Sequence, residues 1–179
     1  MPPCPPWQSC PLTVFDARPR SQAALFRALL QFDVERNRRY LRGQQGYDET
    51  YCNVFVWDAT RALGCEVPHW VTNAEGKRVE TSALGVIHWL RSFGPAQGWY
   101  RVSREDAMAG ANGGWPVVAC WENAERTRDG RLKPSHVAML LPPNGTECRI
   151  AQAGAENLFD VPIARGVGRG REIEFWAHP

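Results

Sequence analysis

The stretch that decides the fold runs from residue 48 to residue 64 and reads DETYCNVFVWDATRALG. Its acidic start and cap-type residues are typical of the positive end of a helix dipole. The next residues, Tyr51–Leu63, are strongly apolar, and Gly64 follows at the position where helices commonly end. We therefore expect a mostly buried helix, with Cys52 in its first turn.

Other helices are expected on both sides of this stretch, followed by strands. The predicted helices are Ser21 to about Leu41, Ser82–Phe93 and a turn at Ser103–Met108. The predicted strands are Trp115–Trp121, His136–Leu141, Cys148–Ala153 and Glu172–Trp176, with a short extended piece at Trp99–Val102. A charged, turn-rich segment, residues 122–134, reads as a long exposed hairpin loop. Helices first and an antiparallel meander afterwards predict an α+β fold.

The composition limits the domain organisation and the class of function. The chain has 179 residues, 44% of them apolar, and a formal net charge of +2. Residues 1–20 read as an extended Pro-rich arm and residues 21–179 as one domain. The near-balance of charge argues against nucleic acid as the main ligand, and no apolar run approaches the length of a membrane span.

Arginines 27, 36, 38, 39 and 42 are expected on a solvated face of the first helix, with contact to an anionic polymer as the alternative. The arm contains Cys4 and Cys10, for which a disulfide and a pair of free thiols are both open. No CxxC pair or Cys/His cluster with zinc spacing occurs, so a metal centre is not predicted.

Cys52 is a candidate nucleophile because a helix N-terminus and an imidazole together stabilise a thiolate. Four histidines are available as the imidazole partner. His178 lies next to the C-terminus, His88 lies inside a predicted helix, and His69 stands in a linker where it could line a groove. His136 begins a rigid apolar strand directly after a polar loop, and it is the best candidate base. The alternative for Cys52 is a buried packing residue.

The order of four short motifs resembles the papain-like cell-wall amidases, that is, the NlpC-type peptidases and their CHAP relatives. In chain order, the motifs are Thr50–Val56, Gly98–Ala107, Pro116–Trp121 and Ser135–Met139. The similarity extends from about Tyr40 to Trp176. The resemblance implies a papain-like fold with N-terminal helices packed on a small antiparallel sheet. It also implies a cysteine–histidine hydrolase that cleaves amide or peptide bonds in peptidoglycan and needs no metal or organic cofactor.

The family's nucleophile corresponds to Cys52 and its base to His136. The third, orienting residue corresponds to Gln152, with Asn157 in reserve, and a neutral amide in this position fixes the imidazole tautomer. A tyrosine upstream of the cysteine often lines the family's site. Tyr40 is the loose match, and Tyr47 and Tyr51 lie nearby in the sequence. The backbone N–H of the nucleophile is the expected oxyanion donor.

Two tryptophans beside turns, Trp70 and Trp99, are candidates for stacking on sugar rings, with core packing as the alternative. The family's Asp-Cys-Ser-Gly is replaced by residues 51–54, Tyr-Cys-Asn-Val, and Ser135 stands where a glycine usually precedes the histidine. Extra segments between the cysteine and the histidine are expected to change which substrate fits.

The expected partner is the peptide stem of peptidoglycan. Because the chain shows no signal peptide, we expect it to be made in the cytoplasm and to reach the wall by release or delivery. A phage lysin freed by a holin, a virion enzyme and a secreted effector with an immunity protein all fit. Two alternatives remain at this stage: a non-catalytic module that binds glycan or peptide, and a cysteine-dependent amidase or acyltransferase with a substrate outside the wall.

Overall fold

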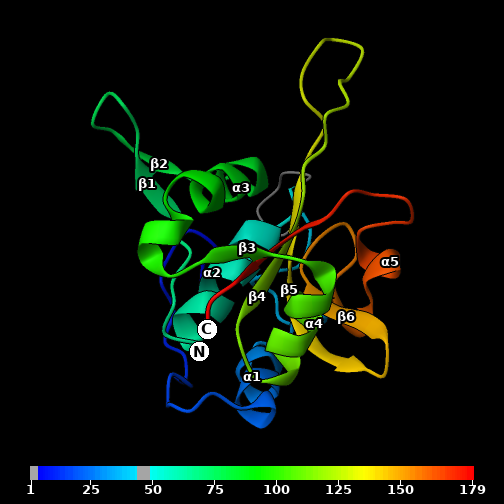
Figure 1. The fold of residues 1–179 in the computed structure, drawn as a ribbon. Coiled ribbons are helices and arrows are strands. Elements are labelled where there is room, and N and C mark those ends of the chain that lie inside the picture. Colours follow the sequence, from blue (N-terminus) through cyan, green and yellow to red (C-terminus); the bar gives the residue numbers. More distant parts are fainter. Residues whose placement is uncertain (1–3, 44–48) are drawn as a thin grey trace.

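A computed structural model describes residues 4–43 and 49–179 and has an α+β fold (Figure 1). Its helices are α1 (Gln22–Leu30), α2 (Cys52–Ala62), α3 (Ala83–Ser92), α4 (Arg104–Asn112) and the short α5 (Ile163–Gly166), with a 3₁₀ turn at Gly94–Gln97. Its strands are β1 (Trp70–Thr72), β2 (Arg78–Glu80), β3 (Tyr100–Val102), β4 (Val117–Trp121), β5 (His136–Asn144), β6 (Glu147–Gln152), β7 (Leu158–Pro162) and β8 (Glu174–Ala177).

One antiparallel sheet organises the fold, in the strand order β3-β8-β4-β5-β6-β7. The strands β4 and β5 lie at its centre, and residues 117–120 of β4 and 137–141 of β5 are buried without alternation. Such a pattern indicates that both faces of these strands are covered. Helices α1, α2, α3 and α4 all contact β5, so this strand is the structural centre against which α2 is placed.

The helix α2 forms where the sequence predicts a buried helix. Its apolar residues are buried along nearly the whole length, because the helix packs against the sheet. The helices α3 and α4 begin after serine caps, in which Ser82 Oγ accepts from the N–H of Gly85 and Ser103 Oγ accepts from the N–H of Asp106. The predicted starts of both helices are confirmed, but α4 continues to Asn112, beyond the single turn that was predicted to end at Met108.

The first helix is shorter than predicted. It ends at Leu30 instead of about Leu41, and Asp33 then adopts a left-handed conformation with φ 41°. Asn37 stabilises the turns that follow, because its side chain donates to the carbonyl of Phe32 and accepts from the N–H of Arg39. Side chain–backbone hydrogen bonds of this kind compete with helix continuation.

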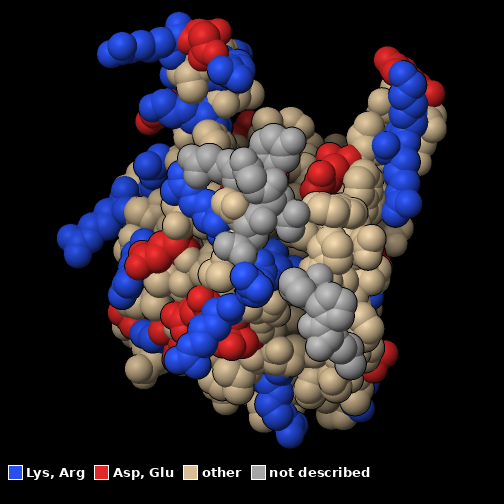
Figure 2. Space-filling view, turned by 180° about the vertical axis from the view of Figure 1, so that it is seen from behind, with Lys and Arg blue, Asp and Glu red and all other residues tan. Residues whose placement is uncertain are grey.

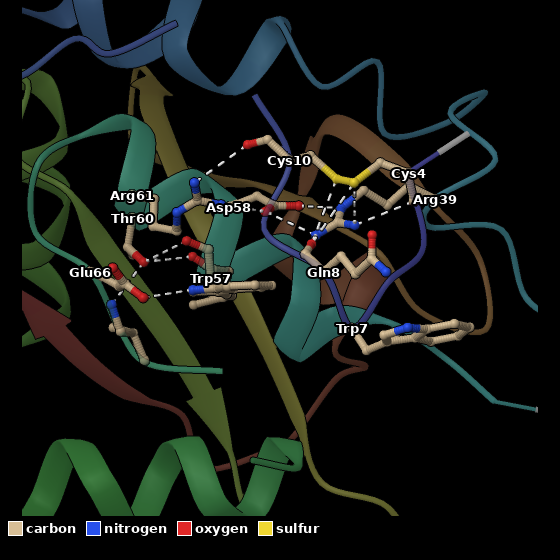
Figure 3. Close-up of polar contacts among 12 residues, drawn as sticks. Cys4, Trp7, Gln8, Cys10, Arg39, Trp57, Asp58, Thr60, Arg61 and Glu66 are labelled. Carbon is tan, nitrogen blue, oxygen red and sulfur yellow. Dashed lines mark hydrogen bonds and ion pairs between the residues drawn. A yellow bond between two sulfur atoms is a disulfide. The ribbon is translucent and has the colours of Figure 1, made fainter. Parts of the chain in front are cut away.

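The same turns carry Arg39 into the interior, so its predicted place on a solvated face is wrong. Only 4% of Arg39 is exposed, and its guanidinium donates to the carboxylate of Asp58 on α2 at 2.6 Å and 3.1 Å. It also donates to the carbonyls of Pro5 and Gln8 in the arm (Figure 3). A buried arginine therefore joins the arm to the middle of α2.

The described part of the arm, residues 4–20, contains no helix or strand. Cys4 and Cys10 form a disulfide (Figure 3), which decides between the two alternatives left open by the sequence. Trp7, inside the disulfide loop, is exposed, and its carbonyl accepts from the indole of Trp70 at 3.2 Å. The arm is thus fastened to α2 and to β1.

Two hairpins project from the same end of the molecule: β1–β2 and the connection between β4 and β5 (Figure 1). Residues 124–134 of that connection are exposed, as the sequence indicates. Figure 2 shows Lys and Arg side chains on both projections and a lower surface between them. In the described part of the chain, no helix is long and apolar enough to span a membrane.

Candidate active site

Cys52 occupies the first residue of α2, as predicted. Tyr51 is the N-cap and makes no side-chain capping bond, so the first turn presents backbone N–H groups that no cap side chain satisfies. The thiol is 3% exposed, and the backbone N–H groups of Asn53 and Val137 donate to its sulfur. A negative charge on this sulfur is therefore stabilised by the helix terminus and by the start of β5.

His136 stands at the first position of β5 and pairs with Trp121 of β4. Its imidazole is hydrogen-bonded to the Cys52 thiol. The other side of the ring is used as well, because His136 Nε2 lies 2.8 Å from Gln152 Oε1. Since Nε2 faces the amide, Nδ1 is the nitrogen left for the sulfur. The structure thus brings together the three residues that the sequence analysis assigned to catalysis.

Gln152, the last residue of β6, is itself held in one orientation. Its Nε2 donates to the carbonyl of Glu156 at 3.1 Å, which leaves Oε1 to accept from the imidazole. An acceptor opposite Nε2 requires a proton on that nitrogen and fixes the tautomer of neutral His136 with Nδ1 as the base. The amide therefore performs the orienting part of a triad.

Two glycines make room for this pair. A Cβ at Gly166 would lie 2.3 Å from Gln152 Oε1, and a Cβ at Gly154 would lie 3.2 Å from His136 Cε1. Gly166 ends α5, which the sequence analysis did not predict. Because any side chain at Gly166 would overlap the amide oxygen, the glycine belongs to the architecture of the site.

The thiol and the imidazole shift each other's pKa. Burial alone would raise the pKa of Cys52, but the hydrogen bond and charge of His136, with the two backbone N–H groups, lower it overall. Burial alone would lower the pKa of His136, but the hydrogen bond and charge of Cys52 and the hydrogen bond to Gln152 raise it overall. Both shifts favour a thiolate beside an imidazolium, which is the reactive form of such a pair.

Cys52 and His136 lie in a cleft with a volume of about 1020 Å³. Cys52, His136 and Gln152 line this cleft together with Tyr51. The walls include residues that the sequence analysis did not single out for the site: Arg42, Glu49, Asn53, Glu80, Trp121, Leu132, Lys133, Glu156 and Arg165. They come from segments distant in sequence, so no local pattern could have assigned them to one cleft.

The remaining candidates lie elsewhere. Tyr40 and Trp99 are 0% exposed, so the prediction that they contact substrate is wrong, and both are core residues. Trp70 is half-buried beneath Arg78 and lies outside the cleft lining. The amide of Asn157 donates to the carbonyls of Val34 and Tyr40, which is a structural tie and not an alternative orienter.

Among the other histidines, His69 is buried and stacks on Trp57 with the ring centroids 4.7 Å apart. Tyr47 lies outside the described residues. The described residues contain no group of three or more His, Cys, Asp or Glu side chains positioned to hold a metal ion.

Comparison with models of known protein families gives no match, and comparison with curated proteins gives no significant match either. The assignment of a function therefore depends on the geometry of the Cys52 site.

Proposed function

We propose that this chain is a cysteine hydrolase of the papain-like NlpC/CHAP type that cleaves an amide or peptide bond in peptidoglycan. The observation that supports the proposal is that Cys52, His136 and Gln152 lie next to one another in the lining of a cleft, with the nucleophile at the start of a buried helix. A packing cysteine has no need of an oriented imidazole, a fixed tautomer and backbone donors around its sulfur.

The reaction is acyl transfer in two halves. The Cys52 thiolate attacks the carbonyl carbon, and the oxyanion of the tetrahedral intermediate accepts from the backbone N–H of Cys52. The His136 imidazolium gives its proton to the departing amine nitrogen as the C–N bond breaks, which leaves a thioester. His136 then takes a proton from water, the resulting hydroxide displaces the thiol, and the free acid leaves. Throughout, Gln152 holds the imidazole ring in place.

The place of action is part of the same proposal. A structural disulfide persists in oxidising surroundings such as the periplasm or the cell exterior. The Cys4–Cys10 disulfide is consistent with a protein that reaches the wall after release or delivery, as a lysin with a holin partner or as an effector with an immunity protein.

The test uses purified peptidoglycan. We expect the native protein to release soluble fragments and Cys52→Ala to release none, with Cys65→Ala as the matched control for loss of a buried thiol. Mass spectrometry of the fragments identifies the bond, and transfer to an added amine would indicate an acyltransferase. Full lytic activity of Cys52→Ala would overturn the assignment. Slow alkylation of Cys52 by iodoacetamide at neutral pH would favour a non-catalytic binding module instead.

A further inference from the structure

The loop closed by the Cys4–Cys10 disulfide directs carbonyl groups at a buried arginine (Figure 3). The carbonyls of Cys4 and Gln8 accept from the guanidinium of Arg39 at 3.4 Å and 2.9 Å. The carbonyl of Pro5 accepts from the same group. The remaining two N–H groups are donated to the carboxylate on α2. Since a guanidinium has five N–H donors, the disulfide loop satisfies three of them.

The carboxylate on α2, Asp58, is the centre of a buried ion cluster. Besides both contacts with Arg39, it accepts from the hydroxyl of Tyr40 at 2.8 Å and lies 3.5 Å from the guanidinium of Arg61. Arg61 in turn donates to the carbonyl of Cys10 at 3.4 Å. Burying a charge is costly unless its hydrogen bonds are satisfied. The carbonyls of the disulfide loop therefore stabilise the buried ion cluster at the middle of α2.

The ring closure restricts the directions in which these carbonyls point. The described arm, residues 4–20, has no helix or strand that would do so. Besides the bonds to the two arginines, the carbonyl of Trp7 accepts from the indole of Trp70 at 3.2 Å. Opening the ring frees the backbone dihedrals between the two cysteines, so an open loop loses more conformational entropy when it docks.

The disulfide is accessible to a small thiol. Cys4 and Cys10 are both partly exposed, whereas the other four cysteines are free and buried. The thiolate of a monothiol such as glutathione attacks one sulfur, which forms a mixed disulfide and releases one cysteine thiolate. A second glutathione displaces the other cysteine and leaves as oxidised glutathione. Two electrons thus pass from two glutathione thiols to the protein, which gains two thiols, and no group of the cleft takes part.

We propose that the Cys4–Cys10 disulfide is a redox latch that sets how firmly α2 is held. In the oxidised protein, the closed loop covers the ion pair of Arg39 and Asp58 and fastens the helix that carries Cys52. In the protein reduced by cellular thiols, the open loop leaves this position and the ion pair meets water. Full stability is therefore reached only in oxidising surroundings. The latch is independent of the proposed function, and only its consequence, a hydrolase that is most durable outside the reducing cytosol, rests on that function.

The first test is urea denaturation of oxidised and glutathione-reduced protein, in the Cys52→Ala background so that the reactive thiol takes no part. Closing a ring with a sequence separation of 6 should make the folding equilibrium constant about 50-fold larger in the oxidised protein. Cys4→Ser/Cys10→Ser should unfold like the reduced protein and should not respond to glutathione. Cys65→Ala, the loss of a buried thiol, is the matched control and should keep the full response. Equal unfolding of the oxidised and reduced protein would overturn the latch.

The second test removes the docking contact and keeps the disulfide. A disulfide in an undocked loop restricts the folded and the unfolded chain equally, so it does not change the stability. Arg39→Met/Asp58→Asn deprives the loop carbonyls of their donor without leaving an unpaired buried charge. The difference between oxidised and reduced protein should then fall from about 50-fold to less than about 5-fold. An undiminished difference would show that the loop is held by other contacts and would overturn the latch.

Hydrogen exchange gives the third test and needs no change at the ion pair. Reduction of the Cys52→Ala protein should speed amide exchange in peptides from α2 more than in peptides from β6. Equal protection of α2 in both redox states would contradict the latch.

Activity separates the latch from the proposed function. Native protein and Cys4→Ser/Cys10→Ser should release wall fragments at the same initial rate without urea, whereas the variant should lose its activity sooner in urea. A lower initial rate of the variant with unchanged unfolding would overturn the latch. Redox-dependent unfolding in a protein that releases no wall fragments would support the latch and refute the hydrolase function alone.

Discussion

Replacing Gly166 with alanine should disable the orienting amide without touching the nucleophile or the base. The new Cβ would lie 2.3 Å from Gln152 Oε1 and 2.6 Å from Ile150 Cδ1, whereas real Cβ atoms essentially never approach within 3.0 Å. The amide oxygen must therefore retreat by about 0.7 Å if it yields alone. That movement can stretch the 2.8 Å bond to His136 to about 3.5 Å, at the limit of a hydrogen bond.

The size of the effect follows from what this bond stabilises. A hydrogen bond to a charged group contributes about 1.5–3 kcal/mol, and here the charged partner is the imidazolium of His136. If the whole contribution is lost in the transition state, kcat/KM falls by about 10- to 150-fold. The fall should appear in hydrolysis of wall peptides and should be smaller in the alkylation of Cys52, which needs the thiolate but no proton transfer to a leaving group.

The control adds the same methyl group elsewhere. At Gly113, the C-cap of α4, a Cβ would lie no closer than 3.3 Å to any atom and φ is −77°. Gly113→Ala should therefore leave the rate unchanged. The decisive comparison is a double-mutant cycle: after Gln152→Ala, the further change Gly166→Ala should cost no additional activity. Additive losses would show that Gly166 acts by some route other than Gln152 and would refute the reasoning.

Three further predictions concern other parts of the molecule. Asp58→Asn leaves the buried guanidinium of Arg39 without a counter-charge and should lower the free energy of unfolding by about 3–5 kcal/mol, measured by urea denaturation. Tyr40→Phe removes the 2.8 Å hydrogen bond to Asp58 and should cost about 2 kcal/mol of stability, yet kcat/KM should not change because Tyr40 is outside the cleft. Because the pKa of Cys52 is lowered and that of His136 is raised, hydrolysis should follow a bell-shaped pH profile. On the acidic limb the thiolate is lost, and its midpoint should lie below the usual pKa range of a thiol. On the alkaline limb the imidazolium is lost, and its midpoint should lie above the usual pKa range of an imidazole. A rate of hydrolysis that only rises through pH 9 would contradict this prediction.

The parts of the site that could be predicted from sequence are those that local chemistry determines. The apolar run after residue 50 places Cys52 in the first turn of a buried helix, and the polar loop before an apolar run places His136 at the start of a strand. The positions of Ser82 and Ser103 as caps are equally local. Gln152 could be assigned only through the resemblance to a family, since a polar residue at a strand end has no signal of its own.

The parts that were missed depend on which segments meet in space. The sequence around Arg39 continues a helical pattern. The local bonds of Asn37 and the docking of Arg39 on Asp58 and the arm together turn the chain inward there, and the docking has no signal in the sequence. Trp99 stands beside a turn and was a candidate for sugar stacking, but the packing of the core encloses it completely. The cleft lining has the same origin, because Glu80 enters it from β2, a strand distant in sequence from Cys52.

These tertiary contacts divide α2 into two functional parts. Its first turn carries Cys52 and is bonded to β5 and, through Asn53, to the carbonyl of Thr81 directly after β2, and these contacts position the nucleophile. Its middle carries Asp58, the counter-charge of Arg39, and Arg39 in turn binds carbonyls of the disulfide loop. A change in the arm therefore reaches the helix about two turns after the nucleophile and affects how firmly the helix is held. A change at Gly166 instead displaces Gln152 and acts through it on His136, so the two groups of variants should separate into losses of stability and losses of rate.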